Sequence, residues 1–430
     1  MAKWSRTGGK PLRGVIDIPG DKSISHRALL LAGLSEERSE VRGLGPGEDV
    51  TATSDALARM GAQIETGSDG TVSVVGFGMR GAKEPSDVLD ARNSGTGLRT
   101  LLPVAASGTG SFILTGDATL NQRPMLRVVL PLREMGAEIM GRDGGRFAPL
   151  AVQGRPLRGA SHRLEQASAQ VKTCILLAGL AADGTTSVSS PAPSRDHTER
   201  MLRHLGVPIE GDQVKQTVGR TESLPGERWR VPADPSSAMF LLAAASLIPG
   251  SDIEIRNVSL NPLRIGAFEV LRSMGGDIEW SATGQSGGEP VGNVRAGYAE
   301  LHGVEITPEV IPTLIDEIPV LAILAAFASG TTHVSGAGEL KVKESDRIAA
   351  ITDGLRSVGG VAEAHDDGFS IEGGHPLDAA VVEARGDHRI AMSFAVAGLA
   401  ASANITIRGW SSVATSFPGF LETMKAAQRG

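Results

Sequence analysis

The sequence is poor in cysteine and in aromatic residues. Its 430 residues include one cysteine, Cys174, and only 3% of them are Phe, Trp or Tyr. A single cysteine excludes an internal disulfide bond and any metal site built from cysteine thiolates. The scarcity of aromatic rings argues against a surface that stacks the bases of single-stranded nucleic acid. Because Cys174 stands in an apolar run with a helical pattern, we expect it to be buried.

The chain also lacks an excess of positive charge and any apolar run long enough to cross a membrane. A net charge of −7 argues against a protein that binds nucleic-acid backbones, but a local cationic cluster could still bind a small phosphorylated ligand. The longest apolar stretches, such as 239–248 and 318–328, are too short to span a bilayer. Residues 1–20 contain no apolar segment of a signal peptide. We therefore expect a cytoplasmic protein that binds neither membrane nor nucleic acid.

What the sequence does contain is one passage that recurs six times, at intervals of roughly seventy residues. In each copy a polar or charged cluster starts an Ala/Leu-rich helix, which is followed by a β-like run and a second helix that ends at glycine. Such a period indicates a fold built from one supersecondary unit used repeatedly, and its alternating elements predict an α/β or α+β class. The second helices end at Gly61, Gly136, Gly206, Gly275 and Gly359.

The repeats divide into two groups of three. The segment 230–235 contains two prolines and no helical pattern, so it is a candidate crossing between domains. A strand within 10–20 ends in a Pro-Gly turn, and it could belong to the second group and so form another crossing. We predict one domain of 1–20 plus 233–430 and another of 21–232. We also predict second helices at 49–60 and 123–135, strands at 63–66, 72–75, 138–140 and 277–280, and a Gly-rich surface loop at 281–293.

Basic residues gather at the predicted helix starts. If the repeats are related by symmetry, equivalent starts converge, and helix N-termini with basic side chains form a site for small anions. The segment 21–27, with Lys22 and Arg27 around two hydroxyls, suits a phosphate or a carboxylate. A capped helix with solvated charges is the alternative for this segment taken alone.

Other motifs are ambiguous when taken singly. The stretch 92–99 lacks the Lys-Ser/Thr pair of a P-loop, although Gly95 and Gly97 would let a ligand approach the backbone. The group around Asp196 and His197 could suggest a metal, but a helix cap by Asp196 fits its spacing better. The carboxylate pair 316–317 precedes a very apolar helix, where it could cap that helix or act as a base in a cleft.

Together these segments resemble the 5-enolpyruvylshikimate-3-phosphate synthase family, the enolpyruvyl transferases of the shikimate pathway. The resemblance covers essentially the whole chain, with the motifs in the family's order: GDKSISHR (20–27), NSGT (93–96), QRPM (122–125), SAQ (168–170), DE (316–317), KESDR (343–347) and DHR (387–389). It implies two domains, each with three copies of a βαβαββ unit, and an active-site cleft between them that closes on substrate.

The activity that this resemblance implies is that of a 3-phosphoshikimate 1-carboxyvinyltransferase. The 5-hydroxyl of shikimate 3-phosphate attacks C2 of phosphoenolpyruvate while C3 is protonated, and the tetrahedral intermediate then loses phosphate. These two small molecules are the expected partners of a monomer. We expect no metal and no cofactor.

The resemblance also implies roles for individual residues. The expected catalytic residues are Lys22, Asp316 and Glu344, whose division of acid and base roles is left open. The expected contacts with shikimate 3-phosphate are Lys22, Ser23, Arg27, Ser168, Ala169, Gln170, Arg195, Asp316 and Lys343. Those with phosphoenolpyruvate are Lys22, Gly95, Arg123, Gln170, Arg347 and Arg389.

The chain departs from the family pattern at a few positions. Thr415 stands where many members have a lysine just before Thr-Phe-Pro, so one expected cation is missing. This form of the motif resembles the second subclass, which includes glyphosate-tolerant members. Tolerant members often have alanine where this chain has Gly95, whereas many sensitive members have proline where it has Thr100. The two signals conflict and leave glyphosate tolerance open.

Two other functions are compatible with the same scaffold. The related transferase that acts on UDP-N-acetylglucosamine typically has an early Lys-Asn pair and a cysteine in a mobile loop. Here the pair is Lys22-Ser23, and the one cysteine lies in a predicted helix. A non-catalytic anion-binding protein would be expected to lack Lys22, Asp316, Glu344 or the arginines, all of which are present.

Overall fold

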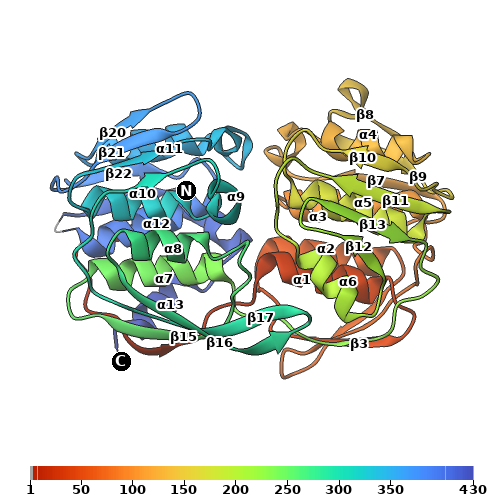
Figure 1. Cartoon of the computed structure of the whole chain (residues 1–430), viewed down its shortest axis with the longest axis horizontal. Coiled ribbons are helices and arrows are strands. Elements are labelled where there is room, and N and C mark those ends of the chain that lie inside the picture. Colours follow the sequence, from red (N-terminus) through yellow and green to blue (C-terminus); the bar gives the residue numbers. More distant parts are fainter. Residues whose placement is uncertain (1–2, 7, 402, 430) are drawn as a thin grey trace. The chain divides into compact units, whose positions relative to one another are not determined.

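The chain forms two compact units (Figure 1). The computed structural model describes residues 3–6, 8–401 and 403–429. Unit 1 comprises Met1–Asp21, Pro232–Gly284 and Pro290–Gly430, and unit 2 comprises Lys22–Val231 and Gln285–Glu289. The predicted domains differ from these units by one residue at each crossing and by the segment 285–289. Residues 1–2, 7, 402 and 430 of the predicted domain 1–20 plus 233–430 lie outside the described residues.

The predicted βαβαββ unit is confirmed most directly by the second and third repeats, in unit 2. In each, the first two strands pair in parallel and the last two add in antiparallel fashion, giving the orders β6-β7-β9-β8 and β10-β11-β13-β12. The second repeat consists of β6 (Leu89–Asp90), α3 (Gly95–Ser107), β7 (Ser111–Thr115), η1 (Leu120–Gln122), α4 (Leu126–Glu134), β8 (Glu138–Arg142), η2 (Asp143–Gly145) and β9 (Phe147–Gln153). The third consists of β10 (Ser161–Arg163), α5 (Ala169–Ala181), β11 (Thr185–Ser189), α6 (His197–His204), β12 (Ile209–Gly211) and β13 (Lys215–Gly219).

The first and fourth repeats take their outer strand from a distant part of the chain. In unit 2, β14 pairs in parallel with β3. In unit 1, β2 pairs in parallel with β15, as expected for an N-terminal strand that belongs to the second group of repeats. The first repeat consists of α1 (Lys22–Gly33), β3 (Arg38–Arg42), α2 (Glu48–Arg59), β4 (Gln63–Thr66), β5 (Val72–Val75) and β14 (Arg228–Arg230). The fourth consists of β2 (Arg13–Ile16), α7 (Pro235–Leu247), β15 (Asp252–Ser259), α8 (Gly266–Ser273), β16 (Asp277–Ser286) and β17 (Glu289–Gly297).

The last two repeats complete unit 1. The fifth has the sheet order β18-β19-β21-β20, and the sixth has β1-β23-β22, with β1 antiparallel to β23. The fifth consists of β18 (Glu305–Ile306), α9 (Ile311–Leu314), α10 (Ile318–Phe327), β19 (Thr331–Val334), η3 (Gly338–Val342), α11 (Arg347–Ser357), β20 (Val361–Ala364) and β21 (Phe369–Glu372). The sixth consists of β22 (Ala380–Glu383), α12 (His388–Ala400), β23 (Ile405–Arg408), η4 (Trp410–Thr415), α13 (Phe420–Ala427) and β1 (Lys3–Arg6).

The first helices of the repeats form the interior of each unit. In unit 1, α7, α10 and α12 lie side by side (Figure 1), and α7 and α10 are almost entirely buried. In unit 2, α3 packs against α1 and α5, and Cys174 of α5 is fully buried, as predicted. A helix that is apolar on every side needs neighbours all round, so it suits the centre of a unit. Among the described residues, no helix is both long and apolar enough to cross a membrane.

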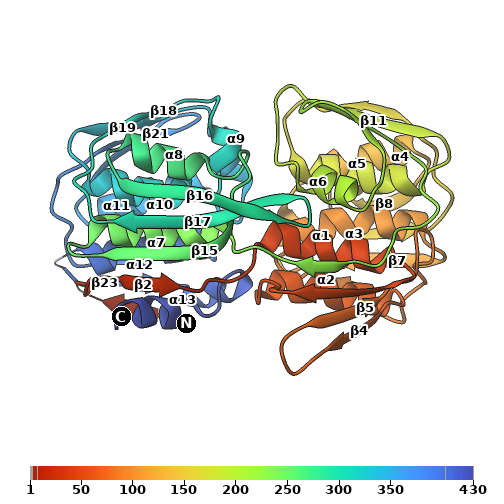
Figure 2. The ribbon, with the colours of Figure 1, turned by 60° about the horizontal axis from the view of Figure 1, so that its bottom comes forward.

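Two local predictions were wrong. The segment 281–293 is not a loop, because β16 and β17 form a long hairpin (Figure 2) whose turn has positive φ at Gly287 and Gly288. The helix expected from residue 123 begins only at Leu126. Arg123 is extended, with φ −81° and ψ 140°, because the ring of Pro124 disfavours a helical conformation in the preceding residue.

The glycines at which the second helices were predicted to end adopt left-handed φ values. Gly206, which follows α6, has φ +77°, and no heavy atom lies within 4 Å of the position of an added Cβ. Gly206→Ala should therefore lower the free energy of unfolding by about 1–2 kcal/mol through backbone strain alone. Gly219→Ala is the matched control, because it has equal space and no left-handed φ. Urea unfolding checks this, and equal midpoints for the two variants would contradict it.

Candidate active site

The predicted site residues fall into two groups, one in each unit. In unit 2 the group lies at the starts of first helices, since α1 begins at Lys22, α3 at Gly95 and α5 at Ala169. Ser94 caps α3 by accepting a hydrogen bond from Gly97 N at 3.0 Å. Ser168 caps α5 in the same way, with Val171 N at 3.5 Å. Each start therefore presents backbone N–H groups and the positive end of a helix dipole.

Gly95 provides the space that the guanidinium of Arg123 occupies. A Cβ on Gly95 would lie 2.8 Å from Arg123 Nη1 and 2.9 Å from Cζ. Arg123 is only 8% exposed, so its charged group lies against the first turn of α3. The structure thus brings these two predicted residues together.

Gln170 joins the same cluster through Arg99, a residue to which the sequence assigned no role. Arg99 Nη1 donates to Gln170 Oε1, and its Nη2 donates to Pro124 O at 3.2 Å. Gln170 Nε2 in turn donates to Thr96 Oγ1 at 2.9 Å. Arg99 therefore orients the Gln170 amide and holds the backbone next to Arg123. The sequence did contain one signal for this role, because Arg99 stands one helical turn after Gly95 and so lies on the same face of the helix.

Lys22 and Arg27 differ in how they are held on α1. Lys22 Nζ lies 3.0 Å from Asp49 Oδ2, and its side chain stays 19% exposed. Arg27 is buried and donates to Thr198 Oγ1 at 2.8 Å, Thr173 Oγ1 at 2.7 Å and Ser23 O at 2.8 Å. Arg27 thus ties α1 to α5 and α6 and fixes the backbone at Ser23.

Arg195 lies two residues before the start of α6, and its neighbours in the chain are held by buried contacts. Lys172 Nζ donates to Ser194 O at 3.1 Å and lies 2.6 Å from Glu199 Oε1. His197 Nδ1 lies 2.7 Å from Glu289 Oε1, at the tip of the β16–β17 hairpin, and both side chains are fully buried. These contacts fix the backbone on both sides of Arg195.

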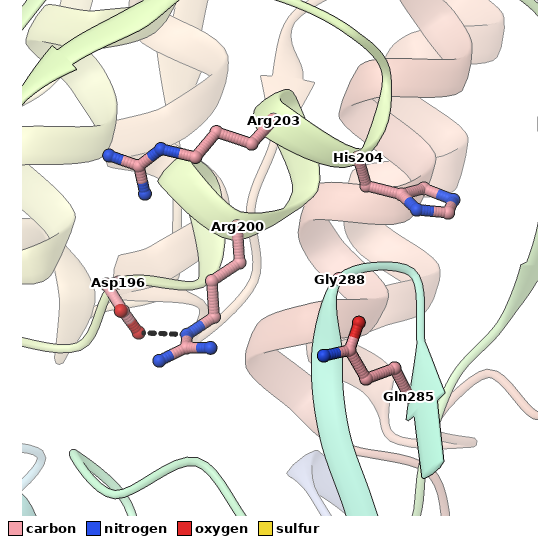
Figure 3. Close-up of a pocket in the computed structure, with 6 residues that line it drawn as sticks. All are labelled: Asp196, Arg200, Arg203, His204, Gln285 and Gly288. Atoms are coloured by element: carbon pink, nitrogen blue, oxygen red, sulfur yellow. Dashed lines mark hydrogen bonds and ion pairs between the residues drawn. The ribbon is translucent and has the colours of Figure 1, made fainter.

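Asp196 stands at the N-cap position of α6, but the expected side-chain cap is absent. Its carboxylate instead accepts from Arg200 Nε at 2.8 Å (Figure 3). A pocket of about 370 Å³ beside this pair is lined by Asp196, Arg200, Arg203, His204, Gln285 and Gly288, and by none of the predicted site residues. Among the described residues, no group of three or more His, Cys, Asp or Glu side chains could hold a metal ion.

Arg347 organises the group in unit 1. It is 1% exposed, and its Nε lies 2.8 Å from Asp387 Oδ2. Its Nη2 lies 2.6 Å from Glu344 Oε2, and its Nη1 lies 3.4 Å from Asp316 Oδ1. The two predicted catalytic carboxylates of unit 1 therefore share one buried guanidinium.

Two further cations complete this cluster. Lys343 Nζ lies 3.5 Å from Asp316 Oδ1, and Arg389 Nη1 donates to Asp316 O at 2.9 Å. Every predicted site residue of unit 1 is thus part of one polar network. Asp387 was missed as a contributor, although it stands in the DHR motif. Its carboxylate both holds Arg347 and accepts from Arg389 N at 2.9 Å.

The network shifts the pKa values of its members in opposite directions. Burial lowers the pKa of Lys343, and the nearby Asp316 only partly offsets this effect. Burial also opposes the charge on Arg347, but Asp387, Glu344 and Asp316 outweigh it and raise the pKa of that guanidinium. For Asp387, burial is again the largest single influence, yet Arg347 brings its pKa below the usual range. Arg347 and Asp387 therefore stay ionised together, as a buried ion pair requires.

Thr415 contributes no charge at the position where many members of the resembled family have a lysine. Its hydroxyl donates to Ser412 O at 2.8 Å, at the end of η4. In place of the lysine, this chain therefore has a short side chain whose hydroxyl is hydrogen-bonded to the backbone of its own 3-10 helix.

His26 is buried between α2 and α3. Its Nδ1 lies 2.8 Å from Thr53 Oγ1, and burial, followed by the charges of Lys22 and Arg27, lowers its pKa well below the usual range. Below a pH of about 6.5 the unfolded chain gains a proton that folded His26 does not, so stability falls by up to about 1.4 kcal/mol per pH unit until the folded pKa is reached.

The substitution His26→Asn should remove this contribution. The free energy of unfolding of the His26→Asn protein should fall less than that of the wild type as the pH is lowered from about 7 to about 5. Urea unfolding at several pH values measures the difference, with the exposed His333→Asn as the control. Parallel curves for wild type and His26→Asn would show that His26 is not kept neutral by burial.

Known proteins resemble this chain along most of its length. The family model of EPSP synthase (3-phosphoshikimate 1-carboxyvinyltransferase) matches residues 6–424. A 3-phosphoshikimate 1-carboxyvinyltransferase from Synechococcus sp. is 49% identical over 417 residues, covering 96% of this chain and 94% of the relative. One from Desulforamulus reducens is 47% identical over 419 residues, covering 97% of each chain.

Solved structures show the same likeness. EPSP synthase from Acinetobacter baumannii superposes with a TM-score of 0.88 at 41% identity, covering 99% of this chain and 98% of the other. The enolpyruvyl transferase NikO from Streptomyces tendae shares the fold at 18% identity, with a TM-score of 0.79 and coverage of 98% and 96%. The chain therefore belongs to the EPSP synthase (3-phosphoshikimate 1-carboxyvinyltransferase) family.

Proposed function

We propose that this chain transfers the enolpyruvyl group of phosphoenolpyruvate to the 5-hydroxyl of shikimate 3-phosphate and releases phosphate. The observation that carries the proposal is the cluster in which Arg347 joins Asp316 and Glu344, in a chain of this family. Full-length relatives at 45–49% identity share one name, which does not favour UDP-N-acetylglucosamine as acceptor or a non-catalytic role.

The residues proposed for phosphoenolpyruvate match its two anionic groups. In unit 2 these are Lys22, Gly95, Arg123 and Gln170, and in unit 1 they are Arg347 and Arg389. Guanidinium groups bind phosphate and carboxylate through paired, charge-assisted hydrogen bonds. The network of Arg99, Thr96 and Pro124 supports this role because it fixes the Gln170 amide before a ligand arrives.

The residues proposed to bind shikimate 3-phosphate supply hydroxyls, amides and cations. The proposed contacts are Lys22, Ser23, Arg27, Ser168, Ala169, Gln170, Arg195, Asp316 and Lys343. The helix start at Ser168 and the held turn at Arg195 offer donors suited to a phosphate. Arg27 has donors committed to Thr198, Thr173 and Ser23, so we propose that it also holds Ser23 in place.

The proposed reaction needs proton transfer in two directions. The 5-hydroxyl oxygen forms a bond to C2 of phosphoenolpyruvate and gives up its proton, while C3 gains one. The intermediate then loses a proton from C3, and the bond between C2 and the phosphate oxygen breaks. We propose that Asp316 orients or deprotonates the hydroxyl and that Glu344 and Lys22 transfer the proton at C3. Action as a cytoplasmic monomer stays a prediction.

The substitution Asp316→Ala should fold and lose nearly all turnover, by about a hundred- to ten-thousand-fold, because it removes the carboxylate proposed to act on the hydroxyl. Release of phosphate from purified protein, dependent on both substrates, measures this. Asp353→Ala is the control, since Asp353 lies half-exposed on α11 of the same unit. A near-normal rate for Asp316→Ala would remove Asp316 from the mechanism.

The substitution Gly95→Ala should weaken inhibition by glyphosate more than binding of phosphoenolpyruvate. The added methyl group would displace the Arg123 guanidinium, and one methyl group in a tight pocket changes affinity by about 10–200-fold. The measurement compares the glyphosate inhibition constant with the KM for phosphoenolpyruvate, using Gly219→Ala as control. Equal shifts in the two constants would refute the expectation. The glyphosate inhibition constant of the wild type also shows whether the chain tolerates glyphosate, on which Gly95 and Thr100 give conflicting signals.

A further inference from the structure

Arg264 is a buried arginine for which the proposed reaction has no role. It stands just before α8 in unit 1 and is 2% exposed. Its Nη1 lies 2.7 Å from Asp21 Oδ2, and its Nη2 lies 3.1 Å from Asp234 Oδ1 and 2.9 Å from Ser236 Oγ. Burial opposes its charge, but Asp21 and Asp234 outweigh this effect and raise the pKa of the guanidinium.

The place of Arg264 in the repeat suggests a specialised use. In three other repeats an arginine stands before or at the start of the second helix, and each is proposed to bind substrate: Arg123, Arg195 and Arg347. In the fourth repeat the corresponding arginine binds carboxylates of the chain itself. Arg264 thus stands where other repeats have an arginine that is proposed to bind substrate anions, but it binds two carboxylates of the protein instead.

The two carboxylates belong to the two segments that lead into and out of unit 2. Asp21 is the residue before Lys22, and Asp234 caps α7 by accepting from Ser236 N at 2.8 Å. The segments are also joined through their backbones, since Asp21 N donates to Pro232 O at 2.7 Å and Asp234 N donates to Pro19 O at 3.0 Å. Arg264 adds a side-chain bridge across this pair.

A second branch of the network leads from Arg264 to the proposed catalytic groups. The Ser236 hydroxyl donates to Glu317, the neighbour of Asp316 in the chain. Glu317 is 2% exposed, and its Oε1 lies 3.6 Å from Arg389 Nη1, the group that also donates to Asp316 O. A continuous set of polar contacts therefore runs from Arg264 through Ser236 and Glu317 to Arg389.

We propose that Arg264 is a positioning residue for the transferase reaction, which fixes both the segment entering Lys22 and the backbone of Asp316. The inference rests on the function proposed above. Catalysis needs its groups in place to within a fraction of an ångström, and a displacement of about 1 Å can lower the rate about a hundredfold. Loss of Arg264 should therefore reduce turnover, although Arg264 is not among the proposed substrate contacts.

The test variant is Arg264→Lys. Lysine keeps the charge, but one ammonium group lacks the planar fork that reaches two carboxylates and a hydroxyl together. We expect kcat to fall about 10–100-fold while KM for each substrate changes less than about threefold. A residue with only a structural role would lower the melting temperature and leave kcat of the folded enzyme unchanged. A kcat within twofold of wild type, or a loss confined to KM, would overturn the proposal.

A second pair of variants covers the case in which Arg264→Lys does not fold. Ser236→Ala cuts the branch to Glu317 and leaves both carboxylate pairs, so kcat should fall severalfold. Ser246→Ala on the same helix is the control, because this buried hydroxyl donates to Leu242 O of its own helix. Equal kcat values for the two serine variants would also overturn the proposal. Wild-type protein that releases no phosphate would instead refute the proposed function.

Discussion

The pairing of buried arginines with carboxylates is the interaction on which the polar interior of unit 1 depends. An isolated buried charge is strongly unfavourable, and a buried ion pair is tolerated only when its remaining donors are also satisfied. Arg347 meets this condition with Asp387, Glu344 and Asp316. Two of these carboxylates, Glu344 and Asp316, are groups proposed for catalysis, so the requirement to satisfy a buried guanidinium also positions the proposed catalytic groups.

The repeated unit explains why charge collects at helix starts. Each first helix is surrounded by apolar neighbours, so its N-terminal end is where polar groups can lie without breaking the core. The caps at Ser94, Ser168 and Asp387 use this end for backbone N–H groups. Arginines that precede or begin second helices lie close to such ends, as Arg123 does beside Gly95 and Arg347 does beside Asp387. The same repeated unit thus supplies two kinds of donor for anions, the backbone N–H groups of helix starts and the side chains of arginines.

Much of this arrangement could be predicted because it is local or periodic. The helix-ending glycines, the strands at 63–66 and 72–75 and the clustered motifs all follow from short patterns. Contacts between distant residues had no such signal. His197 and Glu289 are 92 residues apart, and Glu289 lies in a Gly-rich stretch that resembles a loop because its strands are short of apolar residues. The role of Arg99 was hidden for the same reason, since its side-chain partner Gln170 lies on another repeat.

Some sheets of unit 1 contain an N-terminal strand that pairs with a strand much later in the chain. This pairing determines the order in which the sheets can form during synthesis. The strands β1 and β2 are synthesised well before their partners β23 and β15, which lie at Ile405–Arg408 and Asp252–Ser259. Domains fold as their chain emerges, so most of unit 2 can form while these two strands wait unpaired. The pairing edge of β1 stays open until β23 has been made. Among the described strands, β1 is therefore the earliest to be synthesised and one of the last to join a sheet.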